Sequence, residues 1–459
     1  MPSKQIIDIH CHLFNAKYAI TELAAATWNH LRGNYPHQKG AVKKRAARGI
    51  IEALEGTKEF AAWIARLLEV SLSDCEGNFL TARKNFAESE LGKNASLVAT
   101  PLMMDIYFAL CDNKDEETAG RRGQRAVLTV EAFSVPEDRK KDFEDHFDQI
   151  KNLILEKIQK APATRRRSAS GQALNTLFDD ARKDLLAVPK KTRRGVDPYE
   201  GIELSPGYKQ HMLDLEALSK KYPGQVFPFL AVDPRRIGIL KLIDMKVKKG
   251  KGIFKGIKLY TPLGYLPTHP NLAPVFEYCT TYDIPITLHC SPGGMNNFRK
   301  ENYVKTWEGN DHWEDFKTVR GNKSCYYTAP EKWQPVLTRW PNLRINFAHF
   351  GGGDQLADDH TAWMEEIIKM IQEHPHVYTD ISYHAQSKLP RKILNIVTQN
   401  KGLESKLMFG TDYIMIMMAN KLGGLKKYFD NFTAFQDNLL CDNAKNFLKI
   451  PSSKPEEQT

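Results

Sequence analysis

From about residue 224 onward, short apolar runs alternate with segments whose apolar residues recur every three or four positions. The runs predict buried strands, and the longer period predicts helices that pack one face against a sheet. One such stripe contains Leu272, Val275, Phe276 and Cys279. With two apolar runs nearer the start of the chain, the pattern predicts eight strands, at residues 6–12, 96–104, 226–232, 254–260, 285–290, 344–350, 377–382 and 407–413.

Further helices are predicted between these strands, at about 234–248, 330–340 and 390–399, and around Trp363, Ile367 and Ile371. Eight strands with intervening helices predict an α/β protein with the (β/α)8 architecture of a TIM barrel. In that architecture the active site is built at the carboxyl ends of the strands. We therefore expect functional residues directly after the apolar runs.

Two long segments exceed what a minimal barrel needs, and we interpret them as helical insertions into one domain that spans residues 1–459. The first, residues 13–94, follows strand one and has a stripe of Phe60, Ile64, Leu67 and Leu68, and we expect it to cover the site. The second, residues 110–222, follows strand two, and for it cover of the site is as good an interpretation as packing or contact with another copy in a homo-oligomer. Its stripe contains Phe143, Phe147, Ile150, Ile154 and Ile158.

The composition, with 42% hydrophobic residues, allows a large buried core and predicts disorder only at the ends of the insertions and in the last residues, 452–459. No apolar run approaches the roughly 20 residues that cross a bilayer, and no signal-peptide stretch opens the chain. We therefore expect a soluble cytoplasmic protein without membrane contact. The seven cysteines show no C-x-x-C spacing and predict neither disulfides nor a zinc finger.

The formal charge of +10 does not by itself predict nucleic-acid binding, because much of the excess lies in local runs such as 165–167 and 190–194. Such runs are typical of solvated loops and helix ends. No interleaved aromatic motif accompanies them. A small-molecule substrate is the predicted partner.

Four of the predicted strands end in residues that can bind a metal or move a proton. The first strand closes with Asp8-Ile9-His10-Cys11-His12, and two histidines at this spacing point to the same side of a strand. Further strand ends carry His289, His349 and Asp412. An isolated H-x-H is weak evidence, but four such endings favour one shared site at the rim of the barrel.

Three imidazole nitrogens and a carboxylate, from His10, His12, His289 and Asp412, are a donor set that suits a divalent cation such as zinc. Water bound to such an ion can have a pKa lowered to about 7, which makes hydroxide available at neutral pH. His349 can orient that water, move a proton or polarise a substrate carbonyl. Asp412 can also accept a proton from the water.

The D-x-H-x-H start, the single histidines that end strands five and six, and the G-T-D ending of strand eight resemble the amidohydrolase superfamily. The nearer resemblance is to its amidohydrolase-related branch, which includes enzymes similar to aminocarboxymuconate semialdehyde decarboxylase. The segments Phe-Lys-Gly-Ile-Lys-Leu-Tyr, Ala-His-Phe-Gly-Gly and Asp-Asn-Ala-Lys-Asn-Phe-Leu are similar to that branch. The resemblance implies one zinc ion held by His10, His12, His289 and Asp412, with His349 acting catalytically.

Lys258 on strand four leaves a two-ion alternative open. In other members of the superfamily, a lysine on this strand is carboxylated and bridges two metal ions. The branch often keeps such a lysine without a second metal, so we favour a single ion. If Lys258 were carboxylated, His349 would become a ligand of a second ion.

Other polar residues near the strand ends are candidates for supporting roles. Lys258 and Tyr260 share one face of strand four, and Arg235 follows strand three, so we predict that these three bind substrate. Asp8 lies on the same strand face as the two histidines and is expected to hydrogen-bond a ligand or neighbouring backbone. The glycines at 293–294 and 351–353 allow sharp turns beside the site.

Three classes of function fit these residues. The first is a hydrolase that cleaves a C–N or C–O bond through metal-activated water, and the second is a zinc-dependent non-oxidative decarboxylase of a small carboxylic acid. The third is a non-catalytic barrel or a nuclease. An intact ligand set argues against an empty barrel, and Lys258 stands where the nuclease branch carries a carboxylate. We predict a hydrolase and keep the decarboxylase as the alternative.

Overall fold

A computed structural model of the chain describes residues 4–34, 43–110, 135, 137–160, 171–187, 198–248, 252–299, 301–316, 323–384, 388–418 and 424–450. The basic runs at 165–167 and 190–194 and the tail at 452–459 lie outside these residues. So do parts of the second predicted insertion, at 111–134, 161–170 and 188–197. All structural statements below concern the described residues.

The eight segments predicted as strands each contain a parallel strand, so the α/β class with a parallel sheet is confirmed. Two strands pair with each other, and six form a second sheet in the order β10-β9-β8-β5-β4-β3. The strands are β1 (Lys4–Cys11), β2 (Ala95–Pro101), β3 (Phe229–Val232), β4 (Gly256–Leu259), β5 (Ile286–Leu288), β8 (Ile345–Phe347), β9 (Val377–Asp380) and β10 (Leu407–Met408).

Backbone hydrogen bonds link the pair β1–β2 to both edges of the six-stranded sheet. On one side, Ile9 N donates to Phe409 O over 3.0 Å, just beyond β10. On the other side, Phe227 N donates to Ala99 O over 2.9 Å, and Met103 N donates to Phe229 O over 3.1 Å. These bonds place β1 next to β10 and β2 next to β3.

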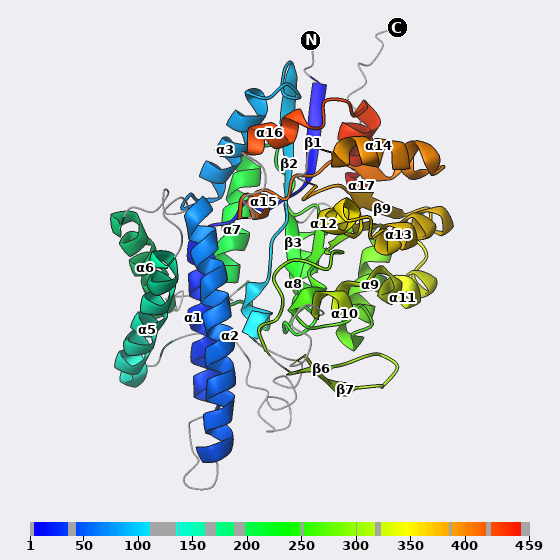
Figure 1. Cartoon of the computed structure of the whole chain (residues 1–459). Coiled ribbons are helices and arrows are strands. Elements are labelled where there is room, and N and C mark those ends of the chain that lie inside the picture. Colours follow the sequence, from blue (N-terminus) through cyan, green and yellow to red (C-terminus); the bar gives the residue numbers. More distant parts are fainter. Residues whose placement is uncertain are drawn as a thin grey trace.

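Helices follow the strands and pack on the outside of the sheet, as Figure 1 shows. They include α8 (Ile239–Lys246), α9 (Ala273–Thr281), α11 (Gln334–Arg339), α13 (Ala362–Glu373) and α14 (Leu389–Gln399). The predicted stripes are the buried faces, since Val275 and Phe276 of α9 and Ile367 and Ile371 of α13 are buried. Trp363, predicted on the same stripe of α13, is only half-buried.

The helix predicted from residue 234 begins at Ile239 instead. Gly238 precedes it with φ of 75°, in the left-handed region, and a Cβ there would lie 2.4 Å from Gly201 O. This glycine therefore turns the chain into the helix and cannot be part of it. The prediction missed this start because it read the apolar period without the turn.

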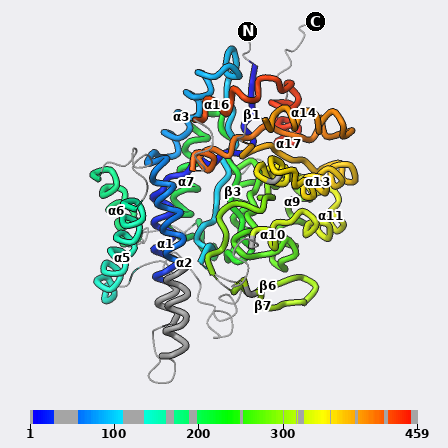
Figure 2. Tube along the Cα trace, in the orientation of Figure 1, coloured from blue at the N-terminus to red at the C-terminus, as the bar shows by residue number. Residues whose placement is uncertain are grey.

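Six long helices occupy the two segments predicted as insertions. Residues 13–94 form α1 (Ala16–Asn34), α2 (Lys43–Val70) and α3 (Cys75–Ala87), and residues 110–222 include α5 (Lys140–Gln159), α6 (Gly171–Leu186) and α7 (Pro206–Lys221). Figures 1 and 2 show α1 and α2 side by side, with α5 and α6 packed on their outer side. The predicted stripe of α2 is buried, as is that of α5 up to Ile154.

The long connection between β5 and β8 carries structure that the sequence did not predict. It forms an antiparallel hairpin of β6 (Glu301–Val304) and β7 (His312–Asp315), followed by the short helix α10 (Lys323–Thr328). In the described part of the chain, no helix combines the length and apolar character required to cross a membrane.

Candidate metal centre

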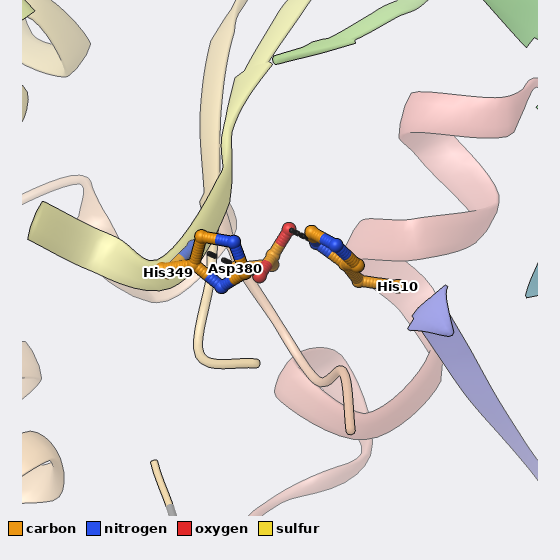
Figure 3. Close-up of side chains that lie close together, drawn as sticks. All are labelled: His10, His349 and Asp380. Carbon is orange, nitrogen blue, oxygen red and sulfur yellow. Dashed lines mark hydrogen bonds and ion pairs between the residues drawn. The ribbon is translucent and has the colours of Figure 1, made fainter. Parts of the chain in front are cut away.

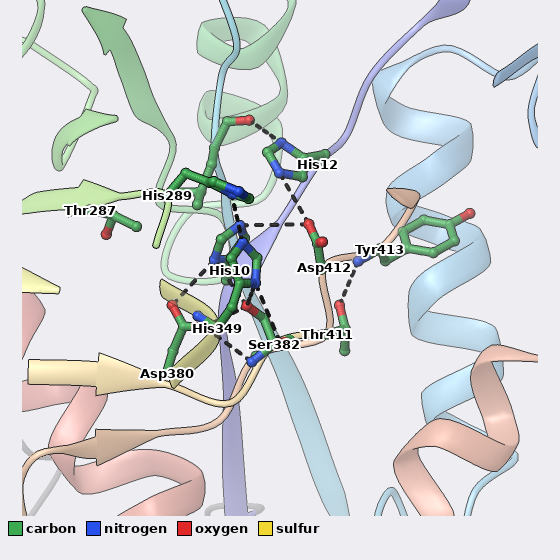
Figure 4. Close-up of polar contacts among 12 residues, drawn as sticks. His10, His12, Thr287, His289, His349, Asp380, Ser382, Thr411, Asp412 and Tyr413 are labelled. Atoms are coloured by element: carbon green, nitrogen blue, oxygen red, sulfur yellow. Dashed lines mark hydrogen bonds and ion pairs between the residues drawn. The ribbon is translucent and has the colours of Figure 1, made fainter. Parts of the chain in front are cut away.

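The candidate residues lie where the parallel strands end. His10 is on β1 and His12 follows it, His289 follows β5, His349 follows β8 and Asp412 comes four residues after β10. Because the carboxyl ends of parallel strands lie at the same edge, these side chains come from distant parts of the sequence to one place (Figure 4). Each of the five is 6% exposed or less.

His10, His12 and Asp412 form one close group. Asp412 Oδ1 lies 3.2 Å from His12 Nε2 and 3.6 Å from His10 Nε2. The ligand atoms of the three residues all lie within 4.8 Å of one another. The structure thus brings together the first strand and the last, as predicted.

His289 and His349 reach this group as a pair. His349 Nε2 and His289 Nδ1 are 3.0 Å apart, and the His349 ring centroid lies 4.7 Å from those of both His10 and His289. His289 does not belong to either of the tight ligand groups among the described residues. The second of those groups contains His10, His349 and Asp380.

The hydrogen bonds of the outer ring nitrogens determine where the lone pairs of the histidines point. His12 Nδ1 lies 2.8 Å from Leu102 O, and His289 Nε2 lies 2.9 Å from Gly293 O. A carbonyl oxygen only accepts, so each of these nitrogens carries the proton. The lone pairs of His12 Nε2 and His289 Nδ1 therefore face the other candidate residues, as a metal ligand requires.

The donor set fits a divalent cation. His10 Nε2 and Asp412 Oδ1 are buried and have no hydrogen-bond partner among the described residues. Leaving a buried carboxylate oxygen unpaired is costly, and a cation would remove that cost. Imidazole nitrogen and carboxylate oxygen are the ligands that zinc and similar ions accept.

Burial also keeps the histidines in the neutral form that a metal ligand needs. It lowers the pKa of His289 to about 3, with Lys258 acting in the same direction. Burial lowers the pKa of His10 and of His349 as well. These imidazoles are therefore neutral at physiological pH, with lone pairs available for a cation.

Asp8 joins the first strand to the segment that carries Asp412. It accepts hydrogen bonds from Thr411 N over 2.9 Å, from Thr411 Oγ1 over 2.6 Å and from His10 N over 3.3 Å. In addition, Asp412 N donates to His10 O over 2.7 Å. The expectation that Asp8 binds neighbouring backbone agrees with these contacts, which hold His10 and Asp412 together.

The backbone is strained where the candidate residues lie. Asp412, His349 and Phe350 have φ of 58°, 69° and 45°, a region that side-chain-bearing residues seldom adopt, and so does Tyr383, with φ of 67°. Such conformations cost of order 1–3 kcal/mol each and persist where surrounding structure fixes them. Their occurrence after β8, β9 and β10 is typical of a preorganised site.

Asp380 and Ser382, at the end of β9, were missed by the sequence reasoning. Asp380 Oδ2 lies 3.2 Å from His10 Nδ1, and Ser382 Oγ lies 2.8 Å from His349 Nδ1 (Figures 3 and 4). The signal was present, because the apolar run at 377–381 also ends in polar residues. Applying the strand-end rule to all eight strands would have found them.

Lys258 and Tyr260 lie beside the cluster. Lys258 is 1% exposed, and its Nζ has no hydrogen-bond partner among the described residues. Burial lowers the pKa of Lys258 to about 8, against the opposing effect of Asp380 and Asp412. The Tyr260 ring centroid lies 4.8 Å from that of His289, and its hydroxyl accepts a hydrogen bond from Met295 N.

Arg235 differs from the expectation that it is available to clamp a substrate carboxylate. Its Nε and Nη2 donate to Asp233 over 2.8 and 2.6 Å, and its side chain is 1% exposed. The guanidinium also lies over the rings of Phe108 and Tyr265. Substrate binding by Arg235 stays an untested prediction.

Comparison with known proteins gives one informative match. A family model described as Amidohydrolase matches residues 7–450. No curated protein matches the chain significantly.

Solved structures resemble the chain only distantly. A 5-carboxyvanillate decarboxylase from Sphingomonas paucimobilis is 11% identical, with 77% of this chain and 98% of that chain covered and a TM-score of 0.36. A probable 2-pyrone-4,6-dicarboxylic acid hydrolase from Acinetobacter baumannii is 13% identical, with 52% and 78% covered and a TM-score of 0.36. An uncharacterised TIM-barrel protein from Bordetella bronchiseptica is 18% identical, with 52% and 72% covered and the same TM-score.

Proposed function

The chain belongs to the amidohydrolase family, whose members are metal-dependent enzymes, and on this premise we propose that it is a hydrolase of a small molecule. The observation that carries the proposal is the convergence of His10, His12 and an unpaired carboxylate oxygen of Asp412 at the strand ends. Because the candidate side chains are almost completely buried, a small molecule suits the site better than a polymer.

We also propose that the eight parallel strands close into one (β/α)8 barrel, with residues 13–94 and 110–222 as insertions into a single domain. The backbone hydrogen bonds from β1 to the β10 segment and from β2 to β3 support closure. Cover of the site by the first insertion is supported by α2, which packs against α15 (Met415–Met418), just after Asp412. Phe60 of α2 also stacks on Phe298 of the β5–β8 connection.

One zinc ion is the proposed cofactor, held by His10, His12, His289 and Asp412. When bound, it would supply Lewis acidity, which increases the acidity of water and polarises a substrate carbonyl. Asp412 is also proposed to accept a proton from the attacking water, at Oδ2, the carboxylate oxygen that is not the proposed ligand. His349 Nε2, which lies 3.0 Å from His289 Nδ1, is proposed to hold or deliver the second proton.

A zinc-dependent decarboxylase is the second candidate, and Lys258 favours it. Its amine is buried and unpaired in the described structure, and a pKa of about 8 leaves it mostly charged at neutral pH. A substrate carboxylate would provide the missing partner. Carboxylation of Lys258 would instead make it acidic and would bring a second ion, with His349 as one of its ligands.

Metal analysis of protein purified without chelator tests the proposal. We expect about one equivalent of zinc or a similar divalent ion, and we expect the His12→Ala variant to lose both metal and turnover. The matched control is His360→Ala, because His360 is an exposed histidine and is not a candidate site residue. Full metal occupancy in the His12 variant would contradict the ligand assignment.

A substrate panel then separates the two reactions. Esters, amides, lactones and aromatic carboxylates are incubated with the metal-loaded enzyme, and each is scored for product and for released carbon dioxide. Product without carbon dioxide supports the hydrolase, and carbon dioxide release supports the decarboxylase. Absence of any metal-dependent turnover across the panel would count against both.

A further inference from the structure

Asp380 is the most heavily hydrogen-bonded side chain at the site, although it is completely buried. Its Oδ1 accepts from the backbone N–H groups of His349 and Ser382, over 3.1 and 3.0 Å, and from the Ser382 hydroxyl. Its Oδ2 accepts from Asn346 Nδ2 over 2.7 Å and faces His10 Nδ1 at 3.2 Å. Two of these donors are backbone N–H groups, which fix the position of Oδ1.

The contact between Asp380 and His10 has only one productive arrangement. An ionised carboxylate accepts hydrogen bonds and cannot donate. The His10 nitrogen that faces it, Nδ1, must therefore carry the ring proton. This leaves the lone pair on His10 Nε2, the atom that lies 3.6 Å from Asp412 Oδ1.

His349 is oriented by a different acceptor. The Ser382 hydroxyl gives its single proton to Asp380 Oδ1, so its oxygen accepts from His349 Nδ1 at 2.8 Å and from His10 Nδ1 at 3.1 Å. The Ser382 carbonyl oxygen, 3.4 Å from His349 Nδ1, also accepts there. His349 Nδ1 therefore faces Ser382 and not Asp380 Oδ2, while His349 Nε2 faces the bare Nδ1 of His289 at 3.0 Å.

We propose that Asp380 is a positioning residue that fixes His10 in the tautomer with a bare Nε2 and so prepares it as a metal ligand. This inference deepens the proposed metal-dependent function. It also makes a statement about the protein without metal, namely where the proton of His10 resides. The two claims can therefore fail separately.

The Asp380→Asn variant isolates this role. The amide oxygen must take the Oδ1 position, since the two backbone N–H groups there can only donate. The amide NH2 then faces Asn346 and His10. Asn346 can rotate its amide, because its own Oδ1 has no partner in the described structure. His10 Nδ1 then faces this amide donor and the Ser382 hydroxyl oxygen, which lies 3.1 Å away. We expect Nδ1 to accept from the amide, which moves the ring proton to Nε2.

The direct measurement is NMR of metal-free protein labelled with 15N in the histidine rings. The ring signals of His10 and His349, among 14 histidines, are assigned by their loss in the His10→Gln and His349→Gln variants. In the wild type we expect His10 protonated at Nδ1. In Asp380→Asn we expect it protonated at Nε2, with His349 unchanged as an internal control.

Zinc affinity provides the second measurement, with two further variants. Asp380→Asn should bind zinc about 10- to 100-fold more weakly, the usual cost of losing a partner behind a metal ligand. Asp380→Ala should destabilise the fold more than Asp380→Asn does. It should weaken zinc binding less than Asp380→Asn does, because alanine offers no donor to His10 Nδ1. Asp8 is a buried carboxylate that contacts the backbone of His10 and not its ring. The Asp8→Asn variant should therefore leave the His10 tautomer unchanged.

Three results would overturn the proposal: protonation of wild-type His10 at Nε2, an unchanged His10 tautomer in Asp380→Asn, or weaker zinc binding in the alanine variant than in the asparagine variant. The first can be read from the wild type even if the variants do not fold. If the wild type binds no metal, the proposed function fails, while the NMR result still decides the role of Asp380.

Discussion

Gly294, in the loop that follows His289, allows a sharp comparison with its neighbour Gly293. Gly294 has φ of 108°, and a Cβ added there would lie 2.6 Å from the Tyr260 hydroxyl and 3.0 Å from His289 Nε2. A Cβ on Gly293 would meet only Ser291 Oγ, at an ordinary 3.5 Å. Gly294→Ala therefore pushes on a candidate metal ligand, and Gly293→Ala does not.

The cost of Gly294→Ala follows from two contributions. A side-chain-bearing residue with such a backbone conformation costs of order 1–3 kcal/mol. The Tyr260 hydroxyl must also retreat, which breaks its 2.9 Å hydrogen bond from Met295 N and costs about 1 kcal/mol more. We expect a loss of about 2–4 kcal/mol in the free energy of unfolding. Gly293→Ala should change it by less than about 1 kcal/mol, in either direction.

Urea denaturation of the metal-free variants measures the first effect, and zinc titration measures the second. Displacement of His289 should weaken zinc binding by about 10- to 100-fold in Gly294→Ala, with Gly293→Ala close to the wild type. Equal zinc affinities in the two variants would refute the reasoning that this loop positions His289. Equal unfolding free energies would refute the steric argument.

Two further predictions concern the stability of the surrounding fold. Burial lowers the pKa of His146 from 6.5 to about 4, so the unfolded chain takes up a proton at a higher pH than the folded protein does. The free energy of unfolding should therefore fall by up to about 3 kcal/mol as the pH drops from 6.5 to 4. His146→Gln should flatten this part of the pH profile in thermal melts, and an unchanged profile would contradict the assignment. The Arg236 guanidinium donates to the buried Asp105 carboxylate over 2.6 and 2.7 Å, and Arg236→Met leaves that carboxylate without this partner. The free energy of unfolding, measured by urea denaturation, should fall by roughly 3–5 kcal/mol. A loss below about 1 kcal/mol would contradict this prediction.

The regular part of the fold was predictable because apolar periodicity reports burial directly. The eight strands and the helices of the second half follow from that pattern, and so do the buried stripes of α2 and α5. Helix α8 begins five residues later than predicted, because a left-handed glycine ends the turn before it. The β6–β7 hairpin was missed because its short strands have no distinctive period.

The site was predictable to the extent that strand ends meet at one edge. His10, His12 and Asp412 converge as expected, since parallel strands bring their carboxyl ends together. Asp380 was missed because the strand-end rule was not applied to β9, which ends at this residue. Its contact with the His10 ring is visible only in the structure. Arg235 was predicted to bind substrate from its position after a strand, and the position did not reveal that its guanidinium binds Asp233, two residues away.

The central claim is that His10, His12, His289 and Asp412 hold one divalent cation. The most direct test is X-ray diffraction from crystals of the zinc-loaded protein, recorded on both sides of the zinc absorption edge. The account predicts a single anomalous peak about 2.0–2.2 Å from His10 Nε2, His12 Nε2, His289 Nδ1 and Asp412 Oδ1. A peak bound by other side chains, or no peak among these four, would contradict it.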